Sequence, residues 1–463
     1  MEIIRFELKD LKSWLDSLDR KPLILRGARQ VGKSTIVRQL ANLANKQCLE
    51  INLERMPEIA EYFQSQQPQQ IWNLLKLHFK HQATEQDSLL FLDEIQATPK
   101  VIGCLRYFYE EFKELPIICA GSLLDLVLTT PEFSVPVGRI EYYYLQPLSF
   151  ENFLHALGEE DLQKWLMEYQ LSTVIPDVLH NKILEYVKLY WLIGGMPEVV
   201  TAFSVKRDFN LADKIKHDIL ETYQDDLHKY GRLKKIPIIR RVLQNIPGFI
   251  GKQIKYTALD SDSKAYDIRL SLEYLSEARI INIVYHASAN GLPLRAQINR
   301  KKFKLLFLDC GLQNAALGLN NLQILQSRSN WGWSNKGGLA EQFIGQNLYY
   351  QIPKYQAPEL FFWVREKYQA QAEIDYLWQW QQYIIPIEVK AGSSGSLKSL
   401  HYFIEEKQCT LGVRFNNELP SLHLESYKLP LPNFNQSNSK HFKLLSLPFY
   451  LVGQLQRLLE SIL

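Results

Sequence analysis

The chain has 463 residues, 46% hydrophobic and 22% charged, with a formal net charge of +3. This composition is typical of a folded protein of two or three domains and excludes a disordered chain. The net charge is too small to indicate a partner. Five cysteines without a C-x-x-C pair argue against a disulfide framework or a zinc site. Because the N-terminus lacks a signal-peptide pattern and no apolar run approaches about 20 residues, we expect a cytoplasmic protein without a membrane segment.

A phosphate-binding pattern lies near the N-terminus, between an apolar strand at 23–25 and a helix-prone segment at 34–44. Its two glycines let successive N–H groups point at phosphate oxygens, and the helix that follows adds its positive dipole end. Lysine at this spacing reaches the β- and γ-phosphates of ATP, and the next hydroxyl can ligate Mg²⁺. The expected nucleotide-binding residues are Gly27, Ala28, Arg29, Gln30, Val31, Gly32, Lys33, Ser34 and Thr35, with Lys33 on the phosphates and Ser34 on the metal.

The second half of a nucleotide site follows about sixty residues later in the chain. An apolar run from Ser88 ends in Asp93 and Glu94, as expected for a strand of a parallel sheet that is buried on both faces. Such sheets hold ligands at the carboxyl ends of their strands. We therefore expect Asp93 to hold Mg²⁺, directly or through water, and Glu94 to polarise the attacking water as the catalytic base.

Two further residues are candidates for contacting the nucleotide. Ser122 ends a third apolar strand that begins at Leu115. In ATPases with an extra strand between the two motifs, this position senses the γ-phosphate; the alternative is an ordinary serine where a strand meets a turn. Arg139 follows Gly138 and is discussed with the family resemblance below.

The pattern of elements divides the chain into four blocks. Residues 1–155 alternate helices and strands, as an α/β nucleotide-binding domain should. Residues 156–230 are helical, with a helix interrupted at Gly194 and Gly195. Residues 231–320 mix short helices and strands, and residues 335–463 alternate helix and strand patterns again.

The block 231–320 has the order of a winged helix. We expect helices at 238–245 and 264–278 and two wing strands at 280–285 and 304–308. Its flanks are basic, and such clusters can neutralise DNA phosphates. The helix at 264–278 carries mixed charge, which is poor for reading a groove, so domain packing or an oligomer contact is the alternative. The basic residues are Lys229, Arg232, Lys234, Lys235, Arg240, Arg241, Arg300, Lys301, Lys302 and Lys304.

The C-terminal block gathers acids and a lysine on a predicted hairpin. Asp375 lies on a strand at 371–378, and alternation on the next strand, 383–390, turns Glu388 and Lys390 to one face. We expect these three side chains to converge, with the two carboxylates as Mg²⁺ ligands and the lysine activating water. Glu341, on a helix opened by Gly337 and Gly338, can supply a further ligand. Pro386 favours a strand start or a sheet edge.

The run of motifs resembles a family of bacterial and archaeal ATPases with an AAA-like N-terminal domain and a C-terminal domain of unknown function that resembles restriction endonucleases. The resemblance covers nearly the whole length. It is carried by Gly27 to Ser34, Leu92-Asp93-Glu94-Ile95-Gln96, Ala120-Gly121-Ser122, Gly138-Arg139, Leu145 to Phe150, Gly194 to Glu198, Glu341, Glu373-Ile374-Asp375 and Pro386-Ile387-Glu388-Val389-Lys390.

This resemblance implies an α/β protein in which a three-layer P-loop core with a parallel sheet precedes a helical and winged-helix middle and a nuclease-like end. It makes Arg139 a candidate for contacting nucleotide in cis or from a neighbouring copy, against the alternative of a structural surface arginine. We expect ATP hydrolysis with Mg²⁺. In one interpretation, ATP gates a Mg²⁺-dependent nuclease that acts on DNA. In the other, the C-terminal fold does not cut, and the protein is a nucleotide-switched regulator of DNA binding or assembly. The sequence leaves homo-oligomerisation open.

Overall fold

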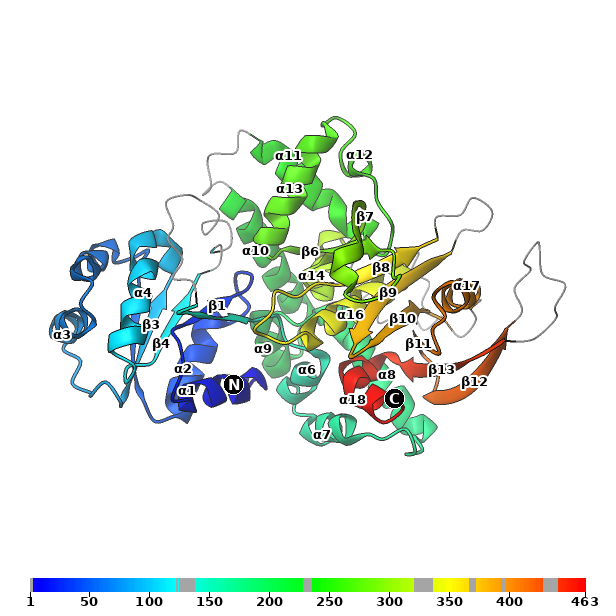
Figure 1. Ribbon diagram of the computed structural model, residues 1–463, viewed down its shortest axis with the longest axis horizontal. Helices are drawn as coiled ribbons and strands as arrows, with labels where there is room; N and C mark the ends of the chain where they lie inside the picture. Colours follow the sequence, from blue (N-terminus) through cyan, green and yellow to red (C-terminus); the bar gives the residue numbers. More distant parts are fainter. Residues whose placement is uncertain are drawn as a thin grey trace. The chain divides into compact units, whose positions relative to one another are not determined.

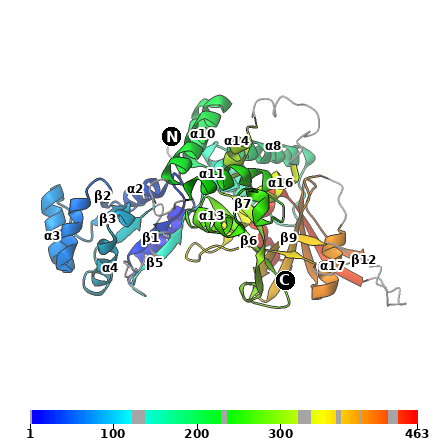
Figure 2. The same ribbon diagram turned by 90° about the horizontal axis from the view of Figure 1, so that it is seen from above.

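The computed structural model describes residues 3–121, 124, 138–227, 235–319, 336–365, 372–392, 397–427 and 440–463. The chain forms two compact units (Figures 1 and 2). The N-terminal unit comprises Met1–Leu148 with Tyr274–Ile280 and Pro353–Ala357, and the C-terminal unit comprises Ser149–Glu273, Ile281–Ile352 and Pro358–Leu463.

The N-terminal unit alternates strands and helices, as expected for its α/β class. Its elements are α1 (Glu7–Asp16), β1 (Leu23–Arg26), α2 (Lys33–Leu43), β2 (Gln47–Asn52), η1 (Pro57–Ser65), α3 (Pro68–Phe79), β3 (Ser88–Asp93), η2 (Ile95–Ala97), α4 (Pro99–Glu111), β4 (Ile117–Ala120) and β5 (Glu141–Tyr144).

The five strands of this unit form a parallel sheet in the order β2-β3-β4-β1-β5. The apolar run of β3 is fully buried from Leu89 to Leu92, as its sequence predicts. On one face of the sheet, α3 and α4 build a core around Trp72 and Phe108; α2 packs against β3 and β4 through its own buried side chains Ile36, Val37 and Leu40. The expected parallel sheet between helices is confirmed, and β4 lies between β1 and β3.

The C-terminal unit combines a helical part with a large sheet. Its elements are α6 (Phe150–Ala156), α7 (Glu160–Glu168), α8 (Asp177–Ile193), α9 (Pro197–Lys206), α10 (Phe209–Asp226), α11 (Ile236–Asn245), η4 (Ile246–Phe249), α12 (Tyr256–Leu259), α13 (Ala265–Glu277, which ends in the other unit), β6 (Ile281–Ala287), η5 (Leu294–Gln297), β7 (Ile298–Phe307), α14 (Cys310–Ala316), α16 (Lys336–Gln351), β8 (Phe361–Val364), β9 (Glu373–Trp380), β10 (Tyr383–Val389), α17 (Lys398–Lys407), β11 (Leu411–Asn416), β12 (Ser421–Tyr427), β13 (Lys440–Pro448), η6 (Phe449–Gln454) and α18 (Leu455–Glu460).

Eight strands of this unit form one mixed sheet in the order β12-β13-β11-β10-β9-β8-β6-β7. Helix α16 packs against β7 and β10, and α17 packs against β9, β10 and β11. The two strands expected as a wing do form an antiparallel hairpin, β6 and β7. Because β6 also pairs with β8, this hairpin is the edge of the large sheet. The division into four domains and the winged-helix assignment stay predictions.

The predicted hairpin of the C-terminal block is present, but its proline does not lie at a sheet edge. Strands β9 and β10 pair antiparallel, with Pro386 opposite Leu377. Strand β10 is interior because β11 flanks it on the other side. The expectation of a sheet edge is therefore wrong. The interior strand tolerates the proline because its pairing with β11 begins only at Ile387, so a proline at 386 interrupts no hydrogen bond between these two strands.

The helix break at the Gly-Gly pair is confirmed and has a specific partner. Helix α8 ends at Ile193, and Gly194 has a φ of 81°. A Cβ at Gly194 would lie 2.0 Å from Oδ1 of Asp309. The same buried carboxylate caps α14 and accepts from the backbone N–H of Gly195 at 2.6 Å. A residue without a side chain is therefore needed where α8 meets Asp309.

Within the residues that the structure describes, no helix combines the length and the apolar character needed to cross a membrane.

Candidate functional site: a phosphate loop and a buried carboxylate cluster

The loop between β1 and α2 has the backbone that a phosphate cradle requires. Gly27 and Gly32 both have positive φ, at 150° and 90°. A Cβ at Gly27 would lie 2.3 Å from the carbonyl oxygen of Leu145, so only glycine fits this close approach. Within the loop, Ala28 and Val31 are buried and Gln30 is exposed, and Thr35 in the first turn of α2 is also exposed. The first turn of α2 begins at Lys33 and presents its free N–H groups at this point.

Lys33 folds back onto its own loop. Its buried ammonium donates to the carbonyl oxygens of Gly27 at 2.9 Å and Ala28 at 2.8 Å. Burial lowers the pKa of Lys33 to about 8, although the charges of Glu94 and Asp93 oppose this shift. A buried cation whose ammonium is bonded to carbonyl oxygens gains from a nearby anion, so this lysine is poised to bind phosphate.

The two expected Mg²⁺ ligands lie together. The hydroxyl of Ser34, at the start of α2, donates to Oδ2 of Asp93 at 3.0 Å. Burial raises the pKa of Asp93, and the hydrogen bond from Ser34 opposes that shift. A hydroxyl and a carboxylate at the end of a strand are hard oxygen donors, so this pair fits Mg²⁺ beside a nucleotide.

Glu94 follows Asp93 in a left-handed conformation, with a φ of 50°. Its backbone N–H donates to Oδ1 of Asp93 at 3.0 Å, and its own carboxylate accepts from the side chain of Gln96. The turn thus places Glu94 beside Asp93 in the chain, with its carboxylate close enough for its charge to act on Lys33.

The remaining nucleotide candidates have different outcomes. Ser122 lies outside the described residues. Arg139 lies at the surface, where its guanidinium pairs with Glu110 of α4 at 2.7 Å and stands over the ring of Tyr109. Among the described residues, its contacts are therefore with α4, not with the phosphate loop. Arg29 lies in the loop and is half-buried.

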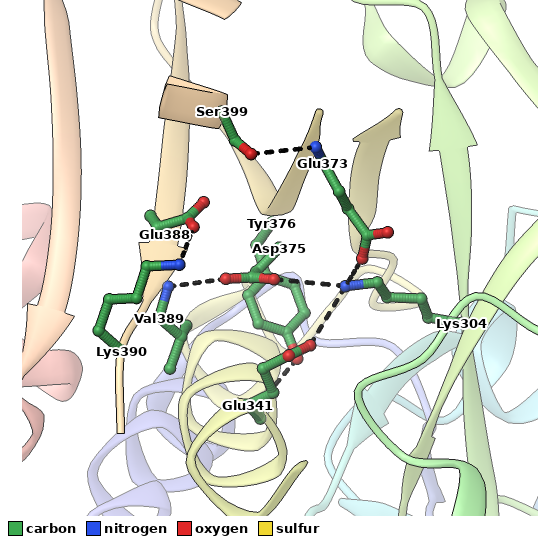
Figure 3. Close-up of polar contacts among 9 residues, drawn as sticks. All are labelled: Lys304, Glu341, Glu373, Asp375, Tyr376, Glu388, Val389, Lys390 and Ser399. Carbon is green, nitrogen blue, oxygen red and sulfur yellow. Dashed lines mark hydrogen bonds and ion pairs between the residues drawn. The ribbon is translucent and has the colours of Figure 1, made fainter. Parts of the chain in front are cut away.

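The second candidate site is a buried cluster of carboxylates and lysines in the C-terminal unit (Figure 3). Asp375 on β9 and Glu388 on β10 lie on neighbouring strands, next to the aligned pair Tyr376 and Ile387. Glu341 faces them from α16, as the sequence predicts. Oδ2 of Asp375 accepts from the N–H of Val389 at 2.8 Å, and the hydroxyl of Tyr376 donates to the carbonyl oxygen of Glu341 at 2.8 Å. These bonds tie the two strands and the helix together around the cluster.

A lysine from the expected wing occupies the centre of the cluster. Lys304 of β7 has a side chain only 2% exposed, and its ammonium lies 3.2 Å from Glu341 and 3.4 Å from Asp375. It also pairs with Glu373. Burial alone would lower the pKa of Lys304, but these carboxylates raise it well above its usual value. Lys304 therefore stays charged and neutralises the acids around it.

Lys390 and Glu388 form the other side of the cluster. The ammonium of Lys390 pairs with Oε1 of Glu388, and Oε2 of the same buried carboxylate has no hydrogen-bond partner among the described residues. Burial, followed by the charge of Asp375, raises the pKa of Glu388 to about 8 against the opposing effect of Lys390. Burial and Asp375 likewise raise the pKa of Glu341 to about 8. Burial is thus the main reason that both carboxyls hold their protons more tightly, and the nearby lysines offset it only in part.

The sequence analysis did not include Lys304 in the carboxylate cluster. It placed this residue in a basic run for DNA phosphates, yet the side chain is buried among acids. Other basic residues of that set also pair with acids: Lys235 with Asp267, and Arg241 with Asp260 at 2.9 Å. The residues at 228–234 are outside the described part. The apolar residues on both sides of Lys304 could have indicated that its side chain is buried. These neighbours are all buried in the structure: Phe303, Leu305, Leu306, Phe307 and Leu308.

The cluster does not fit a divalent cation as it stands. In the described ranges, no three His, Cys, Asp or Glu side chains are arranged to hold a metal ion. Three of the carboxylates already bond to the ammonium of Lys304. A single buried charge therefore takes the place that Mg²⁺ would need among Glu341, Glu373 and Asp375.

Family profiles cover three parts of the chain. Residues 19–154 match a family described as an AAA domain. Residues 184–323 and 336–434 match two domains of unknown function, DUF8612 and DUF4143. No curated protein matches the chain. Together with the parallel sheet and the phosphate loop, the first match supports an AAA-like ATPase domain in the N-terminal part of the chain. A restriction-endonuclease-like identity for the C-terminal part is not confirmed.

Two solved structures show remote similarity. One is C. elegans PCH-2, with 11% identity and a TM-score of 0.29, and the match covers 45% of this chain and 65% of that one. The other is a signal transduction ATPase with numerous domains from Pyrococcus horikoshii, a protein with a tetratricopeptide repeat sensor. It has 12% identity and a TM-score of 0.27, and the match covers 75% of this chain and 46% of that one. The chain thus spans less than two thirds of the length of either protein.

Proposed function

We propose that the protein binds ATP with Mg²⁺ in the loop between β1 and α2 and hydrolyses it there. The observation that carries this proposal is the Ser34–Asp93 hydrogen bond of 3.0 Å beside a buried lysine and a helix N-terminus. Lys33 would leave the carbonyl oxygens of its loop for the β- and γ-phosphates. Bound Mg²⁺ would neutralise charge on the phosphates, and Ser34 and Asp93 would hold it. Glu94 would orient the attacking water, because phosphoryl transfer depends mainly on positioning and charge stabilisation.

Two substitutions test binding and turnover separately. Lys33→Ala should abolish ATP binding while the fold survives, and Lys9→Ala, an exposed lysine of α1, is the matched control. Glu94→Gln keeps the shape of the side chain but removes its charge. We expect it to bind ATP almost normally and to hydrolyse it at least about a hundredfold more slowly. Unchanged affinity in Lys33→Ala would overturn the site, and wild-type turnover in Glu94→Gln would overturn the base.

For the C-terminal unit we propose the non-cutting interpretation, a nucleotide-switched regulator of assembly. Lys304 supports this choice, since it already pairs with Asp375, one of the two acids that a nuclease would use to hold Mg²⁺, and with Glu341, the assisting acid. The pairing of Lys235 and Arg241 with acids favours assembly over DNA binding. The competing interpretation is a Mg²⁺-dependent nuclease in which Asp375 and Glu388 hold the metal, Lys390 activates water and Glu341 assists.

Incubating the protein with DNA and Mg²⁺, with ATP or a non-hydrolysable analogue, separates the two interpretations. We expect no DNA cleavage above that of an Asp375→Ala variant under either nucleotide. Cleavage that is lost in Asp375→Ala, while ATP hydrolysis stays intact, would establish the nuclease and overturn the regulator.

A further inference from the structure

The two edges of the eight-stranded sheet are treated differently. At one edge, β7 carries Arg300, Lys301 and Lys302, is covered in part by the bridge of Ile254 to Phe303, and pairs with β6 through a register shift. Charges, cover and bulges are the usual means of blocking an edge against another chain. At the other edge, β12 pairs with β13 over seven residues without a shift. It contains no lysine and no proline, and no further described strand flanks it.

The two faces of β12 also differ. Tyr427 is buried and bonds Glu405 of α17, so the odd-numbered residues of the strand face the helix. The even-numbered residues face the other way, where Leu422 is 44% exposed and Leu424 is 65% exposed. An edge that no other described strand flanks, with two solvent-exposed leucines on one face, is suited to receiving another strand.

We propose that β12 joins a second copy of the chain by antiparallel self-pairing, with Leu424 opposite Leu424 across a two-fold axis. Such an interface is isologous: both copies contribute the same strand. The proposal identifies the surface through which the proposed regulator of assembly would assemble, and it rests on that part of the proposed function only. The two sheets would continue into each other at this edge.

Two polar side chains of β12, His423 and Glu425, select this register. A two-fold axis perpendicular to the sheet keeps odd residues opposite odd residues. With Leu424 on the axis, His423 of each copy lies opposite Glu425 of the other, which makes two complementary pairs. Moving the axis to Glu425 would set like charges against each other, and moving it to His423 would lose both mixed pairs. Within one chain, His423 already approaches Glu425 at 3.1 Å, so the second copy completes a ladder of these groups.

The test measures the mass of the full chain in solution, without nucleotide, over a concentration series. We expect a dimer for the wild type and for Leu77→Lys, an exposed leucine of α3 (78% exposed) that serves as the matched control. Leu424→Lys should weaken dimerisation at least about tenfold, a loss of 1.4 kcal/mol. A wild type that stays monomeric, or a Leu424→Lys variant that dimerises as well as the wild type, overturns the proposal. Since no nucleotide is present, either failure leaves the ATPase assignment standing.

Cysteine cross-linking tests the register itself. Leu424→Cys places two thiols opposite each other across the axis, at a separation that a disulfide can bridge with small adjustment. Leu422→Cys places each thiol opposite Ser426 instead. Under mild oxidation we expect a covalent dimer for Leu424→Cys and none for Leu422→Cys or the wild type, whose own Cys48 and Cys409 are half-buried. A covalent dimer from Leu422→Cys in place of Leu424→Cys would overturn the register.

Discussion

Lys304 is the residue on which the carboxylate cluster depends. Its ammonium is the common partner of Glu341, Glu373 and Asp375, whereas Lys390 pairs with Glu388. Removing one member of a buried ion pair leaves the other charge unpaired in a poor dielectric. The cluster is therefore stable as a set and unstable when its central cation is lost.

The first prediction follows from that balance. Lys304→Met should lower the free energy of unfolding by about 3–5 kcal/mol, the cost of breaking a buried pair. Adding Mg²⁺ or Mn²⁺ should restore part of this loss, because a divalent ion can then enter among the acids. Denaturant unfolding with and without metal measures both effects. In the wild type, added metal should not stabilise the C-terminal unit. If metal stabilises this unit in the wild type as much as in Lys304→Met, the role given to Lys304 is contradicted.

The raised pKa values predict a pH dependence. Glu341 has a pKa of about 8 in the folded chain and 4.5 as the reference, so between these values the folded state binds more protons than the unfolded state. Stability from this group is complete below about pH 4.5 and is lost as the pH rises to about 8. Glu341→Gln cannot lose a proton at this position. Its free energy of unfolding relative to that of the wild type should therefore be about 1–3 kcal/mol higher at pH 8 than at pH 5.

Thermal unfolding at the two pH values tests this gain. Glu185→Gln, an exposed glutamate of α8 whose side chain is 67% exposed, is the control and should change equally at both. If the Glu341→Gln variant behaves like this control, the buried carboxyl is not the group that loses stability with pH.

At the scale of elements, the break between α8 and α9 is a packing device. Asp309 lies two residues after the end of β7, caps α14 and accepts a hydrogen bond from the N–H of Gly195. Gln346 of α16 donates to the same carboxylate at 3.2 Å, and Gln342 of α16 bonds the backbone of Phe307. One buried acid therefore joins the helical part of this unit to the strand and the helix that carry Lys304 and Glu341.

Alanine substitutions at two glycines of similar φ test the close approach at this break. Gly194 and Gly158 have almost the same φ, 81° and 83°. A Cβ at Gly194 would meet Oδ1 of Asp309 at 2.0 Å, while at Gly158 no atom of the described residues lies within 4 Å. Gly194→Ala should therefore cost about 1–3 kcal/mol more than Gly158→Ala, the typical cost of overpacking. Equal loss in denaturant unfolding would mean that backbone strain alone explains both glycines.

Local patterns predicted most of the elements that carry the two sites. The parallel sheet, the helix break at Gly194 and the hairpin with Asp375 and Glu388 could be predicted because short apolar runs, glycines and strand alternation specify them. The position of Lys304 could not. Its partners Glu341 and Asp375 lie 37 and 71 residues further along the chain, and a lysine after Arg300, Lys301 and Lys302 looks like part of a solvated strand.

Pro386 failed as a signal for a related reason. Its missing N–H excludes one hydrogen bond, but the sequence does not tell where the neighbouring ladder begins. Since β11 joins β10 only from Ile387, an interior strand tolerates this proline. Pairing partners distant in sequence thus decided both the Lys304 and the Pro386 outcomes.

For the whole molecule, the two sites belong to units with separate cores. One core surrounds Trp72 and Phe108 in the N-terminal unit, and another surrounds Trp363 and Phe403 in the C-terminal unit. A ligand stabilises the state that binds it. ATP with Mg²⁺ should therefore stabilise the N-terminal unit against unfolding. It should stabilise the region of the carboxylate cluster only if the two units unfold together.

Hydrogen exchange resolved by peptide tests this independence. At an ATP concentration of about 100 times the dissociation constant, linkage adds about 2.7 kcal/mol, so exchange in β1 and β3 should slow by up to about a hundredfold. The β9–β10 hairpin should exchange at its former rate. Lys33→Ala should lose the effect in β1 and β3, whereas Asp375→Ala should keep both this protection and ATP hydrolysis. Equal slowing in the hairpin would show that the two units open as one, and the effects of Lys33 and Asp375 substitutions would then not be separable.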